Sequence, residues 1–144
     1  MRSTRSILIG AALVTLALGA TPLTAQAAGP ESPSPSPVGS AANGQLMLYY
    51  DIGYNNWCDD WAGESPDWGT CRNKVSSIYN NGYPGNLDDV WVYWGLNYTG
   101  ARRGIANGVG LSDLRLYPFD ANTGSGSGQA LNDNISSHVW ANIF

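Results

Sequence analysis

Two short loops carry the side chains of this chain that are best suited to chemistry. They are residues 72–77 (RNKVSS) and 132–137 (NDNISS), and each leads from amide or carboxylate positions through a branched apolar residue into a Ser-Ser pair. Asn and Asp stabilise tight turns, and Ser hydroxyls can either fix a turn or face a hard cation. Because such a loop occurs twice in 144 residues, the sequence predicts a duplicated structural unit.

An aromatic signature precedes each loop. Residues 93–100 have an aromatic residue, four residues of any type, a second aromatic residue, one further residue and then glycine. Residues 49–56 repeat this signature with Asn56 in the glycine position, and Asn is the residue other than glycine that best tolerates a positive φ angle. Each signature predicts a folded-over hairpin, in which two strands flank a sharp turn that closes on an aromatic ring.

The aromatic signature and the loop, each present twice, resemble the two Greek-key motifs of a βγ-crystallin domain. The resemblance covers roughly residues 43–144 and implies an all-β fold in which two Greek keys form a two-sheet sandwich. Among secreted bacterial proteins the chain is similar to small peptidase inhibitors of that fold, of the metalloproteinase-inhibitor type. The resemblance therefore implies a secreted protease as the partner, although one fold can host many functions.

The resemblance also implies calcium as a ligand. In βγ-crystallin domains the paired loops exchange ligands, and main-chain carbonyls are joined by side-chain oxygens from the second and fifth loop positions. In this chain those positions are Asn73, Ser76, Asp133 and Ser136. All four are hard oxygen donors, but they carry a single formal charge, and Arg72 and Lys74 add positive charge beside the first loop, so we expect weak affinity. The alternative is that both loops only cap hairpins through bonds from Ser to the backbone.

The first residues of the chain predict export. A basic start, an apolar core at residues 7–20 and an Ala-x-Ala site at residues 25–27 indicate a signal peptide over residues 1–28, and hence a secreted, extracellular protein. Residues 29–43 are rich in Pro and Ser and predict a disordered spacer; a stalk or a pro-segment is the alternative.

All aromatic residues lie beyond the spacer, which predicts one domain over residues 44–144 with repeats at about 44–84 and 85–144. Loss of the two signal-peptide arginines would leave five basic and eleven acidic residues, a net charge of −6. That charge argues against nucleic acid and anionic membranes as partners, and we expect a monomer.

Short runs of β-prone residues between turn residues predict the strands. The predicted strands are residues 46–50, 90–94, 101–105, 114–117 and 137–143. Residues 80–82 and 107–108 are predicted as turns, and the Gly/Ser-rich residues 120–130 as a flexible insertion in the second repeat.

Cys58 and Cys71 are the only cysteines, and an even number in an exported chain predicts a disulfide. On the chain-entropy estimate a loop of this size contributes about 3 kcal/mol to stability. The tethered loop also carries Trp61, Pro66 and Trp68, and a rigid exposed loop is suited to protease inhibition because it loses little entropy on binding.

Two other interpretations of the same aromatic residues stay open. The tryptophans of the tethered loop can pack inward as ordinary core. Alternatively, Trp57, Trp61 and Trp68 can form a sugar-binding face among acidic residues, as in crystallin-fold proteins that resemble killer toxins acting on cell walls.

An enzymatic function is not favoured by the residues present. His138 is the single histidine, and it lies in a predicted strand beside Ser137, where adjacent side chains point to opposite faces. We interpret His138 as a surface or boundary residue. The acidic pairs at residues 59–60 and 88–89 are interpreted as solvated turns. The sequence therefore predicts a non-enzymatic protein without catalytic residues and with no cofactor other than calcium.

Overall fold

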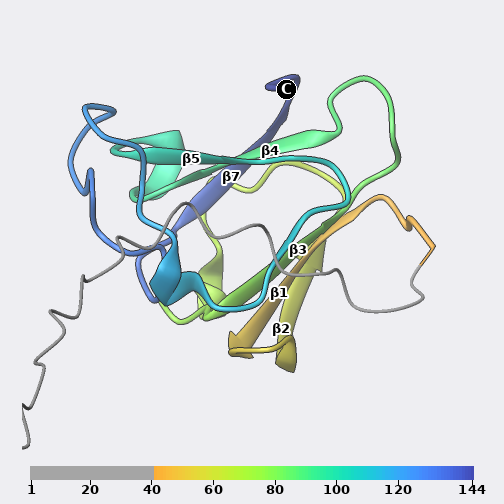
Figure 1. Ribbon diagram of the computed structural model, residues 1–144, viewed down its shortest axis with the longest axis horizontal. Helices are drawn as coiled ribbons and strands as arrows, with labels where there is room; N and C mark the ends of the chain where they lie inside the picture. Colours follow the sequence, from red (N-terminus) through yellow and green to blue (C-terminus); the bar gives the residue numbers. More distant parts are fainter. Residues whose placement is uncertain (1–40) are drawn as a thin grey trace, which may run out of the picture.

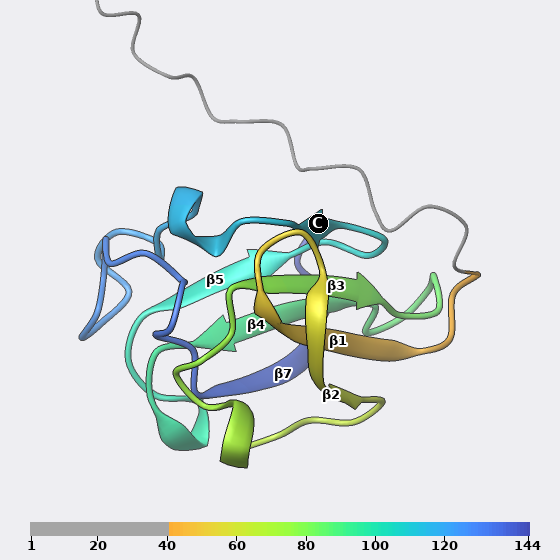
Figure 2. The same cartoon turned by 90° about the horizontal axis from the view of Figure 1, so that it is seen from below.

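The computed structural model describes residues 41–144, which form two antiparallel β-sheets packed on each other (Figure 1). The strands of the first sheet are β1 (Gln45–Asp51), β2 (Asn55–Trp61), β3 (Ser77–Asn81) and β6 (Gly110–Leu111), in the order β2-β1-β3-β6. Those of the second sheet are β4 (Asp89–Tyr93), β5 (Arg102–Ile105) and β7 (Ser137–Ala141), in the order β5-β4-β7. In Figure 2, β1, β2 and β3 lie in front of the other sheet. The predicted signal peptide and nearly all of the spacer lie outside the described residues.

The two halves of the chain exchange segments between the sheets. β6 belongs to the second half but pairs with β3 of the first, with Ile78 opposite Leu111. In return Ser65, from the first half, forms a bridge with His138 of β7 in the second sheet. Each sheet is therefore completed by the other half, and this confirms the predicted pair of Greek keys in a sandwich.

Both predicted hairpins are present. β1 and β2 pair antiparallel across the turn at residues 52–54, and β4 pairs with β5 after the longer turn at residues 94–101. Asn56 has a φ angle of 54° and Gly100 one of 76°, so Asn56 does adopt the left-handed conformation predicted for the glycine position.

The core lies between the sheets, where alternate strand residues point inward. Leu46 and Leu48 of β1 are fully buried, as are Val90 and Val92 of β4. Loop residues close the ends of this core: Val75 and Ile135, the branched apolar residues of the two repeated loops, are each 1% exposed. Truncating a buried aliphatic residue of this kind to Ala costs about 2–5 kcal/mol.

Two local predictions were wrong. Residues 114–117 were predicted as a strand, but Leu114–Leu116 form a 3₁₀ helix (η3) that Asp113 caps by accepting a bond from the Arg115 N–H (3.1 Å). Residues 80–82 were predicted as a turn, but β3 runs to Asn81, because the buried Asn80 amide is satisfied internally by the carbonyls of Asp88 and Ile105. The Gly/Ser-rich residues 120–130, predicted as a flexible insertion, form hydrogen-bonded turns, and Pro118 forms a bridge with Ala130.

Helical structure between residues 41 and 144 is limited to short 3₁₀ turns. Besides η3 they are η1 (Gly69–Cys71) and η2 (Leu96–Tyr98). No helix in this part of the chain is long and apolar enough to span a membrane.

Candidate cation-binding site

The two repeated loops lie against each other, related by approximate two-fold symmetry. The amide N–H of Asn73 donates to the carbonyl of Ile135 (2.9 Å), and the amide N–H of Asp133 donates to the carbonyl of Val75 (3.1 Å). Asn73 and Asp133, at the second loop position, both have a φ angle of 56°. Asn and Asp tolerate this left-handed conformation better than most residues, which explains their presence at that position.

The last serine of each loop anchors a hairpin turn. Ser77 Oγ donates to the carbonyl of Asp51 (2.6 Å) and accepts a bond from the Tyr54 N–H (3.0 Å). Ser137 Oγ makes the matching bonds, to the carbonyl of Gly95 (2.6 Å) and from the Tyr98 N–H (3.1 Å). The hairpin-capping interpretation is therefore correct for this pair of serines.

Three oxygen atoms lie close together at Ser136, one of which is its own Oγ. Its Oγ lies 3.1 Å from Asn73 Oδ1 and 2.9 Å from the carbonyl oxygen of Trp94. These atoms border a hollow of about 270 Å³, here called the Ser136 hollow, which is also lined by Arg72, Gly95, Leu96 and Asn134. Two predicted ligands, Asn73 and Ser136, thus come together from opposite loops.

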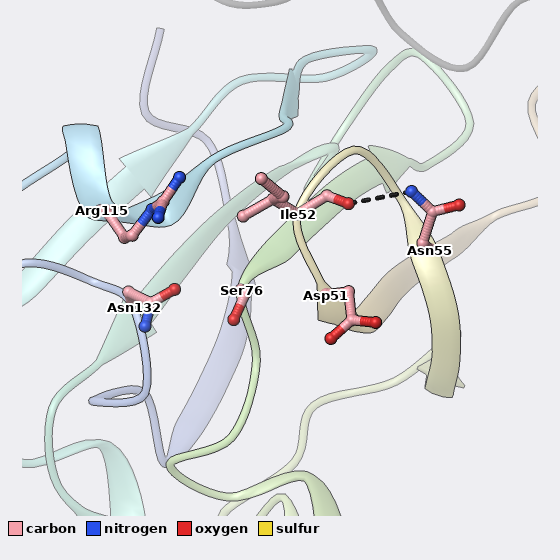
Figure 3. A pocket seen from close by; sticks show the side chains of 6 residues that line it. All are labelled: Asp51, Ile52, Asn55, Ser76, Arg115 and Asn132. Carbon is pink, nitrogen blue, oxygen red and sulfur yellow. Dashed lines mark hydrogen bonds between the residues drawn. The ribbon is translucent and has the colours of Figure 1, made fainter.

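The symmetry-related hollow surrounds Ser76 and has a volume of about 550 Å³ (Figure 3). This Ser76 hollow is lined by Asp51, Ile52, Asn55, Ser76, Arg115 and Asn132. Asn132 Oδ1 is buried and has no hydrogen-bond partner. In Figure 3 this oxygen lies on the side of the amide that faces Ser76. A buried polar atom without a partner costs about 1–3 kcal/mol, so a bound cation at this point would remove a real penalty.

Asp133 orients the Asn132 amide. The Asp133 carboxylate accepts a bond from Asn132 Nδ2 (2.7 Å), and Oδ1 of the same amide is left on the side that faces Ser76 (Figure 3). Asp133 is itself exposed and is not among the lining residues. The predicted ligand Asp133 therefore does not line the Ser76 hollow, and it acts there only by orienting the Asn132 amide.

The two hollows differ in charge. Where the Ser136 hollow has Arg72 and Gly95, the equivalent positions of the Ser76 hollow hold Asn132 and Asp51. Arg72 forms an exposed ion pair with Asp67 (3.2 Å), which offsets only part of its charge. The Ser76 hollow is the better cation site because it combines a carboxylate with an unsatisfied amide oxygen.

Arg115 also lines the Ser76 hollow, but Asp113 holds its guanidinium. Nε and one terminal nitrogen of Arg115 donate to the two carboxylate oxygens of Asp113, at 2.8 and 2.6 Å. These hydrogen bonds from Arg115 lower the pKa of Asp113. The guanidinium charge is therefore largely neutralised beside the hollow.

Known proteins resemble this chain in structure and not detectably in sequence. No protein-family profile matches the chain, and no curated protein matches it. A solved structure concerned with the evolution of the eye-lens βγ-crystallin domain fold superposes with a TM-score of 0.54 at 19% identity, over 74% of this chain and 93% of that one. The fold is that of a βγ-crystallin domain. A βγ-crystallin from Ciona intestinalis gives a TM-score of 0.50 at 14% identity, over 67% of this chain and 99% of that protein.

Three residues of the Ser76 hollow were missed by sequence reasoning: Asp51, Asn55 and Asn132. Asn132 occupies the first position of the second repeated loop, whereas the resemblance implies side-chain ligands only from the second and fifth positions. Asp51 and Asn55 lie within the aromatic signature, at the turn that Ser77 anchors next to the paired loop. The signal that could have found them is the position of this turn in the βγ-crystallin motif.

The disulfide prediction is confirmed. Cys58 and Cys71 are bonded, with their Cα atoms 6.0 Å apart, and the bond ties β2 to η1. Cys71 is fully buried, so the bond also forms part of the core.

The tryptophans of the tethered loop are not exposed anchors. Trp68 is 1% exposed and stacks on the half-buried Trp61, with ring centroids 6.0 Å apart. The inward-packing interpretation is therefore correct for Trp68, and only Pro66 of the proposed inhibitory residues is exposed. The sugar-binding face proposed for Trp57, Trp61 and Trp68 was also wrong, because Trp57 alone is largely exposed, at 57%.

The prediction that His138 is a surface or boundary residue was wrong. Its side chain is fully buried: Trp68 Nε1–H donates to Nδ1 (2.8 Å), so the remaining ring nitrogen, Nε2–H, donates to the carbonyl of Gly63 (2.9 Å). Burial lowers the pKa of His138 to about 4. His138 is therefore a neutral structural residue, and Ser137 beside it bonds to the backbone of Gly95 instead.

Proposed function

We propose that this protein is a secreted, non-enzymatic βγ-crystallin-type module that binds calcium between its paired loops, most tightly in the Ser76 hollow. The observation that carries this proposal is the buried and unpartnered Oδ1 of Asn132, on the side of the amide that faces Ser76; both residues line the hollow, together with Asp51. Calcium prefers carboxylate, amide, hydroxyl and carbonyl oxygens in flexible arrangements, and that is the donor set present.

The donor set also limits the affinity. Asp51 has the only carboxylate among the residues that line the Ser76 hollow, and the other side-chain oxygen donors there are neutral. Few charged ligands and exposed loops are typical of extracellular sites, for which dissociation constants of about 10⁻⁴ to 10⁻³ M are expected. The Ser136 hollow, which contains Arg72 and no carboxylate, is expected to bind more weakly still.

A non-enzymatic role is supported by the state of the single histidine. His138 is buried, neutral and engaged at both ring nitrogens, so it can act neither as a general base nor as a nucleophile in contact with substrate.

Calorimetric titration of metal-free protein with calcium tests the proposal. We expect heat from one site in the range above and a rise in melting temperature at millimolar calcium, since a ligand that binds only the folded state stabilises it. Asn132→Ala should remove this heat. Asn43→Ala, at an exposed residue distant in the sequence from the paired loops, should not change it. Absence of heat in the wild-type protein would show that the loops serve only as hairpin caps.

Peptidase inhibition is the second proposal, and its support is the loop between Cys58 and Cys71. Residues 62–64 and Pro66 are exposed, while the disulfide and the two hydrogen bonds between the backbones of Ser65 and His138 (3.0 and 3.1 Å) brace the loop. Such preorganisation lowers the entropy cost of binding. Inhibition assays against secreted metalloproteinases and serine proteases test this proposal. Glu64→Ala and Pro66→Ala should weaken inhibition without lowering the melting temperature. If the wild-type protein inhibits no protease, the proposal is wrong.

A further inference from the structure

A groove of about 350 Å³ lies at the end of the sandwich where the described chain begins, apart from both cation hollows. We call it the aromatic groove; its walls include Tyr83, Leu87, Trp140, Glu64 and Asn86. Residues 82–88 form the loop from β3 to β4, and Figures 1 and 2 both show this loop beside the first described residues, which lead into β1. Tyr83 is 66% exposed and Leu87 51%, so the groove presents large apolar side chains to solvent.

Two glycines let aromatic rings lie close to the backbone here. Gln45 pairs with Asn81 in the β1–β3 ladder, and Gly44 and Gly82 are the next residues beyond this pair. A Cβ atom on Gly44 would lie 2.6 Å from the Tyr83 ring, and one on Gly82 would lie 2.8 Å from the Trp140 ring. Any larger residue would push the rings away, so these glycines are needed for the shape of the groove.

Leu87 is held in a strained conformation at the rim of the groove. Its φ angle is 56°, a left-handed conformation that is unfavourable for a residue with a bulky side chain. The Asn142 side chain stabilises this conformation, because its Oδ1 accepts a bond from the Leu87 N–H (2.6 Å). Backbone strain of this kind often occurs at ligand-binding sites.

The polar groups of the groove suit a neutral, hydroxyl-rich ligand. None of the ion pairs among residues 41–144 involves Glu64, so its carboxylate is available to accept bonds. Asn86 uses Oδ1 to accept a bond from Asn142 Nδ2 (3.0 Å), which leaves its own NH₂ group available as a donor. No Lys or Arg lines the groove, which argues against an anionic ligand.

We propose that the aromatic groove binds a neutral glycan. The C–H groups of a sugar ring carry partial positive charge and pack on the negative faces of the Tyr83 and Trp140 rings, while sugar hydroxyls bond to Glu64 and Asn86. An extended peptide fits less well, because peptides are commonly held by backbone pairing and the N–H groups of Gly44 and Leu87 are already bonded, to the Asn81 carbonyl and to Asn142. This site is independent of calcium binding in the paired loops.

Affinity electrophoresis through gels that contain soluble neutral polysaccharides tests the proposal. The probes are hydroxyethyl cellulose, glycol chitin and glycogen, each compared with a gel that contains none. We expect retardation by at least one of them, and a loss of affinity of about tenfold or more in Tyr83→Ala, since truncating a central aromatic contact typically has this effect. Tyr83→Phe keeps the ring and should keep most of the affinity. Trp57→Ala, which removes another largely exposed ring, on β2, should match the wild type.

Because Tyr83 is largely exposed, its truncation should not unfold the domain, and thermal unfolding of each variant checks this. Retardation by none of the three polysaccharides would overturn the proposal, and so would retardation that Tyr83→Ala leaves unchanged. Binding of a peptide with the sequence of residues 31–38 in place of the polysaccharides would assign the groove to a proline-rich segment and also overturn it. Calcium titration of Tyr83→Ala separates the two sites, since this variant should bind calcium normally.

Discussion

The hydrogen bond between Trp68 and His138 illustrates what a single buried residue does in this fold. The bond joins the disulfide-tethered loop of the first half to β7 of the second, and Trp61 packs on both rings. A histidine next to a serine in a strand gives no sign of this role in the sequence, because the partner lies 70 residues away.

His138 should make stability depend on pH. Its pKa is about 4 when folded and 6.5 in the unfolded chain, so between these values the unfolded state binds more protons. Stability should therefore be complete above pH 6.5 and decline as the pH falls towards 4, by roughly 3 kcal/mol in total. Denaturant unfolding at several pH values measures this loss, and His138→Gln should flatten the curve in that window. An equally steep curve in His138→Gln would show that other groups control the pH dependence.

Arg72 should weaken calcium binding in the Ser136 hollow. Replacing it with Asp removes a positive charge and adds a carboxylate beside Asn73 and Ser136, so the second, weaker calcium site should tighten. The lost ion pair with Asp67 is exposed and contributes at most about 1 kcal/mol to stability. Calorimetry of Arg72→Asp measures the effect, and Arg102→Asp, the same change at an exposed residue that lines neither hollow, is the control. Unchanged binding in Arg72→Asp would show that this hollow takes no cation.

The Gly/Ser-rich turns at residues 120–130 illustrate how one element can act on a site through another. Trp94 Nε1 donates to Gln129 Oε1 (3.0 Å), and the indole lies against Gly126. The carbonyl of Trp94 is one of the oxygens of the Ser136 hollow. This segment, predicted from composition as flexible, thus packs against a residue of the candidate site.

Gly126→Ala should therefore disturb the Ser136 hollow through Trp94. A Cβ atom at Gly126 would collide with the indole, whereas one at Gly128 would meet nothing within 4 Å. Both glycines have positive φ angles, 93° and 78°, so the backbone strain of the two Ala variants is similar. Trp fluorescence and calcium calorimetry should change in Gly126→Ala and remain close to wild type in Gly128→Ala. Equal effects in both variants would point to backbone strain alone.

The repeated motifs predicted the elements better than local composition did. The aromatic signatures correctly located both hairpins, because an Asn or Gly at positive φ and a closing aromatic ring are local requirements. β3 was missed because Asn80 and Asn81 resemble a turn, although long-range carbonyls satisfy the Asn80 amide. The same limit applies to the candidate site: Asn73 and Ser136 could be paired from the motif, but the free oxygen of Asn132 depends on packing that a sequence does not show.

The disulfide should stabilise the domain without determining its fold. Cys58→Ser with Cys71→Ser removes a constraint on the unfolded chain and should lower the free energy of unfolding by about 3 kcal/mol. The two-sheet core does not depend on the bond for its strand pairing, so circular dichroism should remain that of a β-sandwich. Loss of the β-sheet spectrum in the double variant would contradict this.

At the scale of the whole molecule, the exchange of segments between the halves couples the two loops. Each sheet is completed by the opposite half, through β6 in one case and Ser65 in the other. Neither half has a complete sheet alone, so the domain should unfold in a single transition, and both hollows should form or disappear together. The glycan proposal concerns the opposite end of the same sandwich and can fail without affecting this coupling.

An NMR titration of metal-free protein with calcium tests the central claim most directly. The account predicts that the amide signals of Ile52, Ser76 and Asn132 shift first, and that those of Gly95 and Ser136 follow only at higher concentration. Shifts that begin at Ser136, or no shift at either hollow up to about 10 mM calcium, well above the expected range of dissociation constants, would contradict it.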